Sequence, residues 1–164
     1  MSDNATTAKV SIIMGSQSDW PTMQQATKML DDLGVEYETQ VVSAHRTPAR
    51  LVQFCQQAHQ RGIQIIIAGA GGSAHLAGMA AAMTHLPVVA VPVASKHFQG
   101  MDSLMSMVQM PRGVAVACQA VGEAGAYNAG LISAQMLALS DSKLRDRLQT
   151  WRHAQTFNTP LEVE

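Results

Sequence analysis

Short apolar segments recur along this chain, and each is followed by a stretch with helical character. The segments are Lys9–Met14, Tyr37–Val42, Ile63–Ala68, Pro87–Val93 and Gly113–Ala117. Three of them are almost continuously apolar, as expected of strands that helices cover on both faces. Strand and helix alternating five times predicts an α/β fold. We expect a three-layer sandwich with a five-stranded parallel sheet and right-handed crossovers.

The stretches between the strands carry helix start and stop signals. Gly34 and Gly62 are natural stops, and Thr47-Pro48 combines a capping hydroxyl with a proline of the first turn. The predicted helices are Pro21–Leu33, residues 48–61, His75–Thr84, Met101–Val108, Ala124–Leu139 and, as a C-terminal helix, Ser142–Phe157. We find no repeat or linker. We therefore predict one catalytic domain over residues 9–157, a short disordered lead-in over residues 1–8 and a C-terminal tail over residues 158–164.

Charged residues make up only 14% of the chain, against a usual value of about 25%. So weakly charged a surface suggests that part of it is covered in a homo-oligomer, with the C-terminal helix packing on another subunit. An Ala-rich, weakly charged monomer is the alternative. The formal net charge is −1 and the basic residues are scattered, which argues against nucleic acid as a partner.

Targeting signals are absent from the sequence. No apolar run approaches the roughly 20 residues that span a bilayer, so no membrane association is expected. Residues 1–8 lack the charged and apolar regions of a signal peptide. Cys55 and Cys118 have no metal-ligand spacing and are expected to be reduced thiols, which favours a cytoplasmic location.

Polar residues gather where the predicted strands end, which is where parallel α/β sheets bind ligands. After the first strand come Gly15-Ser16-Gln17-Ser18-Asp19 and a helix start. Hydroxyls and free backbone N–H groups near a helix N-terminus suit a phosphate at Ser16. Asp19 would repel a nearby phosphate but suits ribose hydroxyls. Alternatively, Ser18 and Asp19 only cap the helix.

The second strand is followed by Ser43-Ala44-His45-Arg46-Thr47-Pro48. A guanidinium at Arg46, just before a helix, can bind a phosphate through two N–H groups. His45 would point into the same cleft, and histidine is the side chain best suited to exchange a proton near neutral pH. A surface histidine beside a solvated arginine remains the alternative.

The third strand leads into Gly69-Ala70-Gly71-Gly72-Ser73-Ala74-His75. Glycines let the backbone approach a flat ligand closely, and its N–H groups can hold a carboxylate. His75 is either a second polar contact or only a helix cap. Lys96 and His97, after the fourth strand, could approach the site but are better placed in solvent. No Gly-x-Ser-x-Gly nucleophile turn and no metal-ligand spacing occur.

Four motifs together resemble the class I N5-carboxyaminoimidazole ribonucleotide mutases of bacterial de novo purine synthesis. They are Gly15-Ser16-x-Ser18-Asp19-Trp20, Ser43-Ala44-His45-Arg46-Thr47-Pro48, Ala68-Gly69-Ala70-Gly71-Gly72, and Asp102-Ser103-Leu104 through Val108-Gln109-Met110-Pro111. The likeness extends from about residue 9 to about residue 151. It implies a flavodoxin-like fold, a homo-octamer, and no cofactor, metal or ATP.

The resemblance also implies a substrate and roles for the site residues. The substrate is an aminoimidazole ribonucleotide whose carbamate carboxylate moves from the exocyclic nitrogen to the ring carbon, through CO₂ trapped in the site. His45 is the expected acid and base, and Arg46 binds the 5′-phosphate. The implied substrate-binding residues are Ser16, Ser18, Asp19, Ser43, Arg46, Ala70, Gly71, Gly72 and His75.

The sequence departs from the family pattern at Ser73, Ala77 and Ala115, where alanine, proline and proline are frequent. Ser73 adds a hydroxyl near the carboxylate site. The rival reading is a class II carboxylase that joins free CO₂ to unmodified aminoimidazole ribonucleotide, although Trp20 and the residues after His45 resemble class I. A phospho-receiver module is excluded, because this sequence lacks the acidic residues that such a module carries after its first and third strands. A flavin-binding module remains an alternative.

Overall fold

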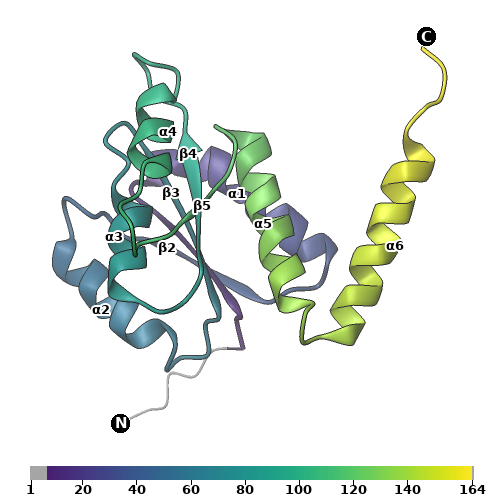
Figure 1. Ribbon diagram of the computed structural model, residues 1–164, viewed down its shortest axis with the longest axis horizontal. Helices are drawn as coiled ribbons and strands as arrows, with labels where there is room; N and C mark the ends of the chain where they lie inside the picture. Colours follow the sequence, from purple (N-terminus) through teal and green to yellow (C-terminus); the bar gives the residue numbers. More distant parts are fainter. Residues whose placement is uncertain (1–6, 164) are drawn as a thin grey trace.

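A five-stranded parallel sheet, flanked by helices on both faces, forms the body of the computed structural model, which describes residues 7–163 (Figure 1). The strands are β1 (Val10–Met14), β2 (Tyr37–Val41), β3 (Ile65–Gly71), β4 (Val88–Val93) and β5 (Ala117–Cys118). The helices are the 3₁₀ turn η1 (Gln17–Asp19), α1 (Trp20–Asp32), α2 (Pro48–Ala58), α3 (Leu76–Met83), α4 (Met101–Val108), α5 (Glu123–Leu137) and α6 (Ser142–Asn158).

The strand order β2-β1-β3-β4-β5 is the flavodoxin-like order, so the predicted fold class is confirmed. The chain moves outward from β1 in both directions, and a switch point therefore lies between β1 and β3. Consecutive side chains of a strand point to opposite faces, which is why Ile12 and Ile13, both fully buried, belong to two separate core clusters. One cluster packs under α2 and α3, the other under α1 and α5.

The fifth strand was predicted wrongly over Gly113–Ala117, because only Ala117 and Cys118 pair with β4. Gly113 has a left-handed backbone, with φ of 97°, and Val114 N–H donates to the Pro111 carbonyl across a tight turn. This turn holds the apolar run away from the sheet until Ala117. The β3 strand is longer than predicted, since Gly69–Gly71 pair with Val91–Val93.

The structure near the two ends of the chain can be compared with the predicted lead-in and tail. Residues 1–6 of the expected lead-in lie outside the described residues, whereas Ala8 is buried in the core beside α2. The last helix, α6, ends at Asn158, packs against the end of α5 and has Leu144 as its one buried residue. Arg147 of α6 also donates from Nε to the Leu33 carbonyl, just after α1, at 2.7 Å. The helix stands clear of the sheet (Figure 1). None of the described helices is long and apolar enough to cross a membrane.

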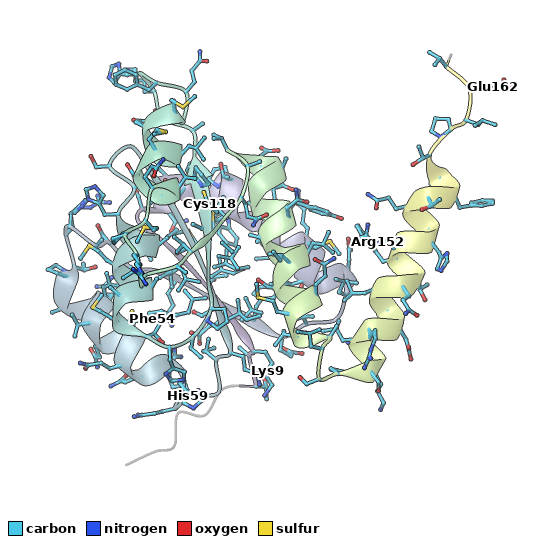
Figure 2. The ribbon with its side chains drawn as sticks, viewed as in Figure 1. Lys9, Phe54, His59, Cys118, Arg152 and Glu162 are labelled. Atoms are coloured by element: carbon cyan, nitrogen blue, oxygen red, sulfur yellow. The ribbon has the colours of Figure 1, made fainter. Side chains whose placement is uncertain are left out.

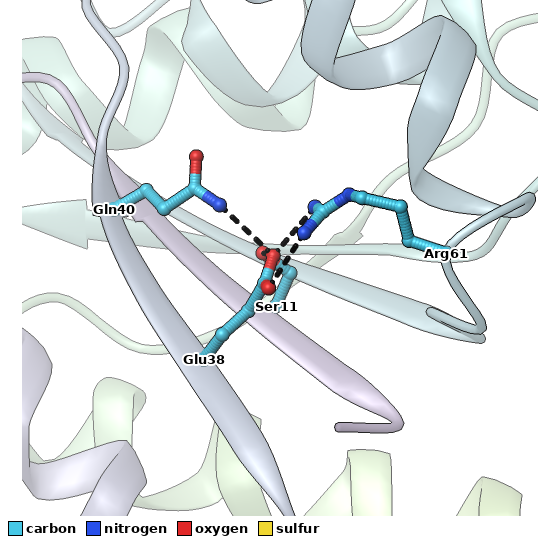
Figure 3. A network of polar contacts seen from close by, with 4 residues as sticks. All are labelled: Ser11, Glu38, Gln40 and Arg61. Carbon is cyan, nitrogen blue, oxygen red and sulfur yellow. Dashed lines mark hydrogen bonds and ion pairs between the residues drawn. The ribbon is translucent and has the colours of Figure 1, made fainter. Parts of the chain in front are cut away.

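A polar network ties the edge strand β2 to the loop after α2 (Figure 3). The Arg61 guanidinium donates to both Glu38 carboxylate oxygens, at 2.6 and 2.7 Å, and Ser11 Oγ, fully buried, donates to Oε1 at 2.9 Å. Burial alone would raise the pKa of Glu38, but the hydrogen bonds from Arg61, Ser11 and Gln40 outweigh it and leave the pKa below its usual value.

Replacing Arg61 with methionine should destabilise the fold by about 1–2 kcal/mol at neutral pH, because a half-buried carboxylate loses its bidentate partner. The lowered pKa of Glu38 means that the contribution is present above the unfolded-state pKa of about 4.3 and is lost as the pH falls through the folded-state pKa. The difference in the free energy of unfolding between Arg61→Met and the wild type should therefore become smaller at acidic pH. Urea denaturation at several pH values measures it, with Arg145→Met on exposed α6 as the control. An equal difference at pH 7 and pH 3 would contradict this account.

Candidate active site

The loops that follow β1, β2, β3 and β4 enclose a cavity of about 570 Å³ at the carboxyl edge of the sheet. That volume suits a ligand of nucleotide size. All ten predicted site residues line it: Ser16, Ser18, Asp19, Ser43, His45, Arg46, Ala70, Gly71, Gly72 and His75. The residues predicted from the sequence therefore lie around one cavity, because the ends of adjacent parallel strands meet at one edge.

Ser16 holds the loop after β1 in place. Its backbone N–H donates to Asp19 Oδ2 at 2.9 Å, and its hydroxyl accepts from the Ser18 N–H, which forms a capping box on η1. The Ser18 hydroxyl also lies 2.9 Å from Ser16 Oγ. If Ser18 is the donor in that pair, the hydrogen of the Ser16 hydroxyl is free for a ligand.

Most of the N–H groups that were expected to be free in this loop are already hydrogen-bonded. The Gly15 N–H donates to Gly69, and the N–H groups of Ser16, Ser18 and Asp19 donate within the loop. Asp19 thus closes the capping box of η1, although its side chain does not cap α1, and an anion here would be met by hydroxyls more than by the backbone. Capping uses Oδ2 and leaves Oδ1 of Asp19 available to a ligand hydroxyl.

Asp19 is almost fully buried although it lines the cavity. Burial raises the pKa of its carboxyl group, while the Ser16 N–H and the nearby Arg46 charge lower it. Burial has the larger effect, so the pKa is higher than usual overall. A ligand hydroxyl that donates to Asp19 would stabilise the carboxylate form in place of water.

Ser43 and Thr47 shape the loop after β2. The Ser43 N–H donates to Thr47 Oγ1 at 3.0 Å, and that hydroxyl donates back to the Ser43 carbonyl at 2.9 Å. The helix starts at Pro48 as predicted, but Thr47 holds the loop and does not cap the helix. Ser43 Oγ accepts from the backbone N and from Nε of Arg46, both at 3.2 Å, and so keeps its own hydrogen for a ligand.

The Arg46 guanidinium bridges the first two loops. Besides its bond to Ser43, it donates to the Gly15 carbonyl at 2.8 Å through one terminal nitrogen. Two of its five N–H groups are thus used to fix its plane, and three remain. An oriented guanidinium beside the Ser16 and Ser43 hydroxyls is well suited to bind a phosphate.

His45 and His75 meet across the cavity from two different loops. His45 Nε2 lies 2.9 Å from His75 Nδ1, and the rings are nearly perpendicular, with centroids 5.0 Å apart. One of the two nitrogens donates and the other accepts, so the pair shares a proton between them. Both side chains are exposed to the cavity. His75 is therefore a polar partner of His45, and it does not cap α3 through its side chain.

The glycines after β3 have different roles. A Cβ on Gly69 would overlap the Met23 side chain, so this glycine allows α1 to pack closely on the sheet. Gly71 and Gly72 line the cavity. The Gly72 N–H, expected to be available for a carboxylate, instead donates to Ser103 Oγ at 2.9 Å.

Sequence reasoning missed Ser95 as a residue of the cavity wall. It lies two residues after β4 ends, and the rule that placed the other loops could have identified it. Lys96 and His97 are exposed and do not line the cavity, in line with the solvent interpretation. Ser103, fully buried on α4, belongs to the fourth motif but was not predicted as a site residue. Its contact with Gly72 arises only in the folded structure.

Possible metal ligands do not cluster within residues 7–163: no group of three or more histidine, cysteine or acidic side chains could hold an ion there. His59 and His85 form a ring pair, with centroids 4.6 Å apart, in a separate pocket beside α2. Burial raises the pKa of the nearby Cys55 thiol to about 11, so it is a poor nucleophile.

Comparisons with known proteins agree with this geometry. Residues 9–158 match the family model described as AIR carboxylase. The N5-carboxyaminoimidazole ribonucleotide mutase of Vibrio parahaemolyticus is 59% identical over 148 residues, covering 90% of this chain and 92% of the relative. The mutase of Escherichia coli K12 is 54% identical over 156 residues, covering 95% and 92%. The crystal structure of Treponema denticola PurE superposes with a TM-score of 0.81 at 27% identity, covering 90% of each chain. The chain therefore belongs to the AIR carboxylase family.

Proposed function

We propose that this protein is an N5-carboxyaminoimidazole ribonucleotide mutase of de novo purine biosynthesis. The observation that carries the proposal is the single cavity in which Arg46 and the serine hydroxyls stand beside the His45–His75 pair and a glycine wall. In this proposal, Arg46 and the serines bind the anion, His45 carries the proton, and the glycines allow a close backbone approach, all within one ligand-sized space. The relatives named as mutases are 54–59% identical, which supports the same assignment.

The ribonucleotide would be bound by its phosphate and ribose. We assign the 5′-phosphate to the Arg46 guanidinium with the Ser16 and Ser43 hydroxyls, since each keeps a donor free. The ribose hydroxyls would donate to Asp19, whose carboxylate is already oriented by the Ser16 N–H. The imidazole ring then lies toward His45 and Gly71.

The proposed reaction moves one carboxylate and one proton. The bond between the exocyclic nitrogen and the carbamate carbon breaks, its electron pair stays on nitrogen, and His45 donates a proton there. The electron-rich ring carbon then attacks the retained CO₂ and forms the new carbon–carbon bond. His45 accepts the proton from that ring carbon, which restores the aromatic ring and the starting state of His45. Retention of CO₂ requires a site closed to solvent.

A labelling experiment tests the proposal. Substrate with ¹³C in the carbamate is converted in a large excess of unlabelled bicarbonate and followed by NMR. We expect the label on the ring carboxylate, because CO₂ does not leave the site. Unlabelled product would mean that CO₂ came from solution and would favour a class II carboxylase. Absence of any product would refute both assignments, and a yellow purified protein would favour a flavin-binding module.

The proposed assembly is a homo-octamer. Its support is the low charge of the chain and the position of α6 and of the tail that follows it, where Glu162 lies away from the body (Figure 2). Large apolar side chains are exposed on α6, on the C-terminal tail and near α4: Phe157, Leu161, Phe98, Met101 and Met105. Such surface is usually covered by another chain. Light scattering should give eight times the chain mass of 17.5 kDa, and a monomer mass would contradict the proposal.

We also propose a cytoplasmic location. Cys55 and Cys118 are free thiols, which is the usual state of cysteine in a reducing compartment. Fractionation of the native host tests this, and recovery outside the cytoplasmic fraction would contradict it.

A further inference from the structure

Helix α4 is attached to two walls of the cavity by one buried hydroxyl. Ser103 is fully buried, and its Oγ donates to the Val93 carbonyl at 2.6 Å. The same oxygen accepts from the Gly72 N–H at 2.9 Å. One hydroxyl thus satisfies a donor in the loop after β3 and an acceptor at the end of β4, which no apolar side chain could do.

The neighbouring residue holds the loop after β4. Asp102 Oδ1 accepts from Ser95 Oγ at 2.6 Å and from the Ser103 N–H at 3.0 Å. Ser95 Oγ in turn accepts from the Gly100 N–H at 3.2 Å. The hydrogen of the Ser95 hydroxyl is therefore committed to Asp102. Although Ser95 lines the cavity, its role in this arrangement is to hold its loop.

The residue that follows Gly72 keeps unused donors. Gly72 has a left-handed backbone, with φ of 72°, and its N–H is already bound to Ser103. Within residues 7–163, neither the N–H nor the hydroxyl of Ser73 donates to another residue. Ser73 is exposed and lines the cavity. The donors that this loop can offer to a ligand are therefore those of Ser73, which directly follows the Gly72 N–H that Ser103 holds.

We infer that Ser103 is a positioning residue that fixes the Gly72 peptide, and with it the Ser73 donors, for the carboxylate or CO₂ of the reaction. The inference rests on the proposed mutase function. Donors held in place before charge develops contribute more than donors that must reorient. Ser103 itself is screened from the cavity by the loop that it holds, and it does not touch the substrate.

The main test compares Ser103→Ala with Ser133→Ala. Ser133 is also fully buried but bonds only within α5, to the Ala129 carbonyl, so it is a matched control. For Ser103→Ala we expect kcat to fall about 10- to 100-fold and KM to change less than about threefold, since other loops bind the phosphate. We also expect the ¹³C label to escape into bicarbonate more often. Label retention does not depend on how much enzyme is folded, so simple destabilisation would not change it.

A second readout is independent of the activity. Hydrogen exchange at the Gly72 amide, followed by mass spectrometry of the surrounding peptide, should be about tenfold faster in Ser103→Ala, because the N–H loses its acceptor. The Ser103→Cys variant has a similar side-chain volume but a weaker acceptor. It should change label retention and hydrogen exchange in the same direction as Ser103→Ala, but by a smaller amount. It replaces Ser103→Ala in the test if the alanine variant does not fold. Unchanged exchange overturns the inference, as does wild-type label retention together with wild-type kcat. A wild-type enzyme without mutase turnover refutes the proposed function, and the exchange result then decides the role of Ser103 alone.

Discussion

Replacing His45 with asparagine should lower kcat by about 10³-fold while leaving the affinity for the ribonucleotide nearly unchanged. His45 now contacts His75 through Nε2, 2.9 Å from His75 Nδ1; asparagine is too short to reach that position, and it cannot carry a proton. General acid–base catalysis typically contributes 10²- to 10⁴-fold, and His45 would serve both the nitrogen and the ring carbon. Affinity should persist because the proposed phosphate contacts come from Arg46, Ser16 and Ser43.

Single-turnover kinetics and substrate titration separate the two quantities. His59→Asn is the matched control, because His59 is also an exposed histidine with a ring partner but lies in a different pocket beside α2. We expect that control to keep both kcat and KM. If His45→Asn turns over within threefold of the wild type, His45 is not the proton carrier, and His75 becomes the residue to replace next.

The fold and the position of the cavity at the carboxyl edge of the sheet were predictable from local signals. Apolar runs that end at Gly15, Ser43 and Gly69 mark the carboxyl ends of strands, and the topology of parallel sheets brings those ends together. Glycine stops and Pro48 in the first turn of α2 located the helices, although α2 ends at Ala58, three residues before the predicted end at Arg61. These signals depend on a few consecutive residues, so sequence alone carries them.

The errors share a physical cause, which is that hydrogen-bond partners are chosen by tertiary structure. The run Gly113–Ala117 has the composition of a strand, but the turn at Gly113 leaves only Ala117 within reach of β4. The N–H of Gly72 looked free in a glycine-rich loop, yet a serine 31 positions away accepts it. No periodicity in the sequence could have indicated that pairing.

Replacing Arg46 with alanine should raise Kd and KM for the ribonucleotide by about 100-fold, with a smaller effect on kcat. The guanidinium joins the first two loops through Gly15 and Ser43, and it keeps three N–H groups for an anion. Hydrogen bonds between charged groups contribute about 1.5–3 kcal/mol each, and two of them account for a loss of this size or larger. Arg46→Lys should recover only part of the affinity, since an ammonium lacks the planar pair of donors.

Isothermal titration with substrate and with ribose 5-phosphate measures the loss directly. Arg50→Ala is the matched control: Arg50 lies in the first turn of α2, donates to the Val41 carbonyl at 3.0 Å, and does not line the cavity. Ribose 5-phosphate separates the phosphate contact from the chemistry, because it carries the anion without the reacting imidazole. If Arg46→Ala binds it as tightly as Arg50→Ala does, the phosphate lies elsewhere in the cavity. Arg46 would then only hold the two loops together, and its effect should appear in the free energy of unfolding instead of in Kd.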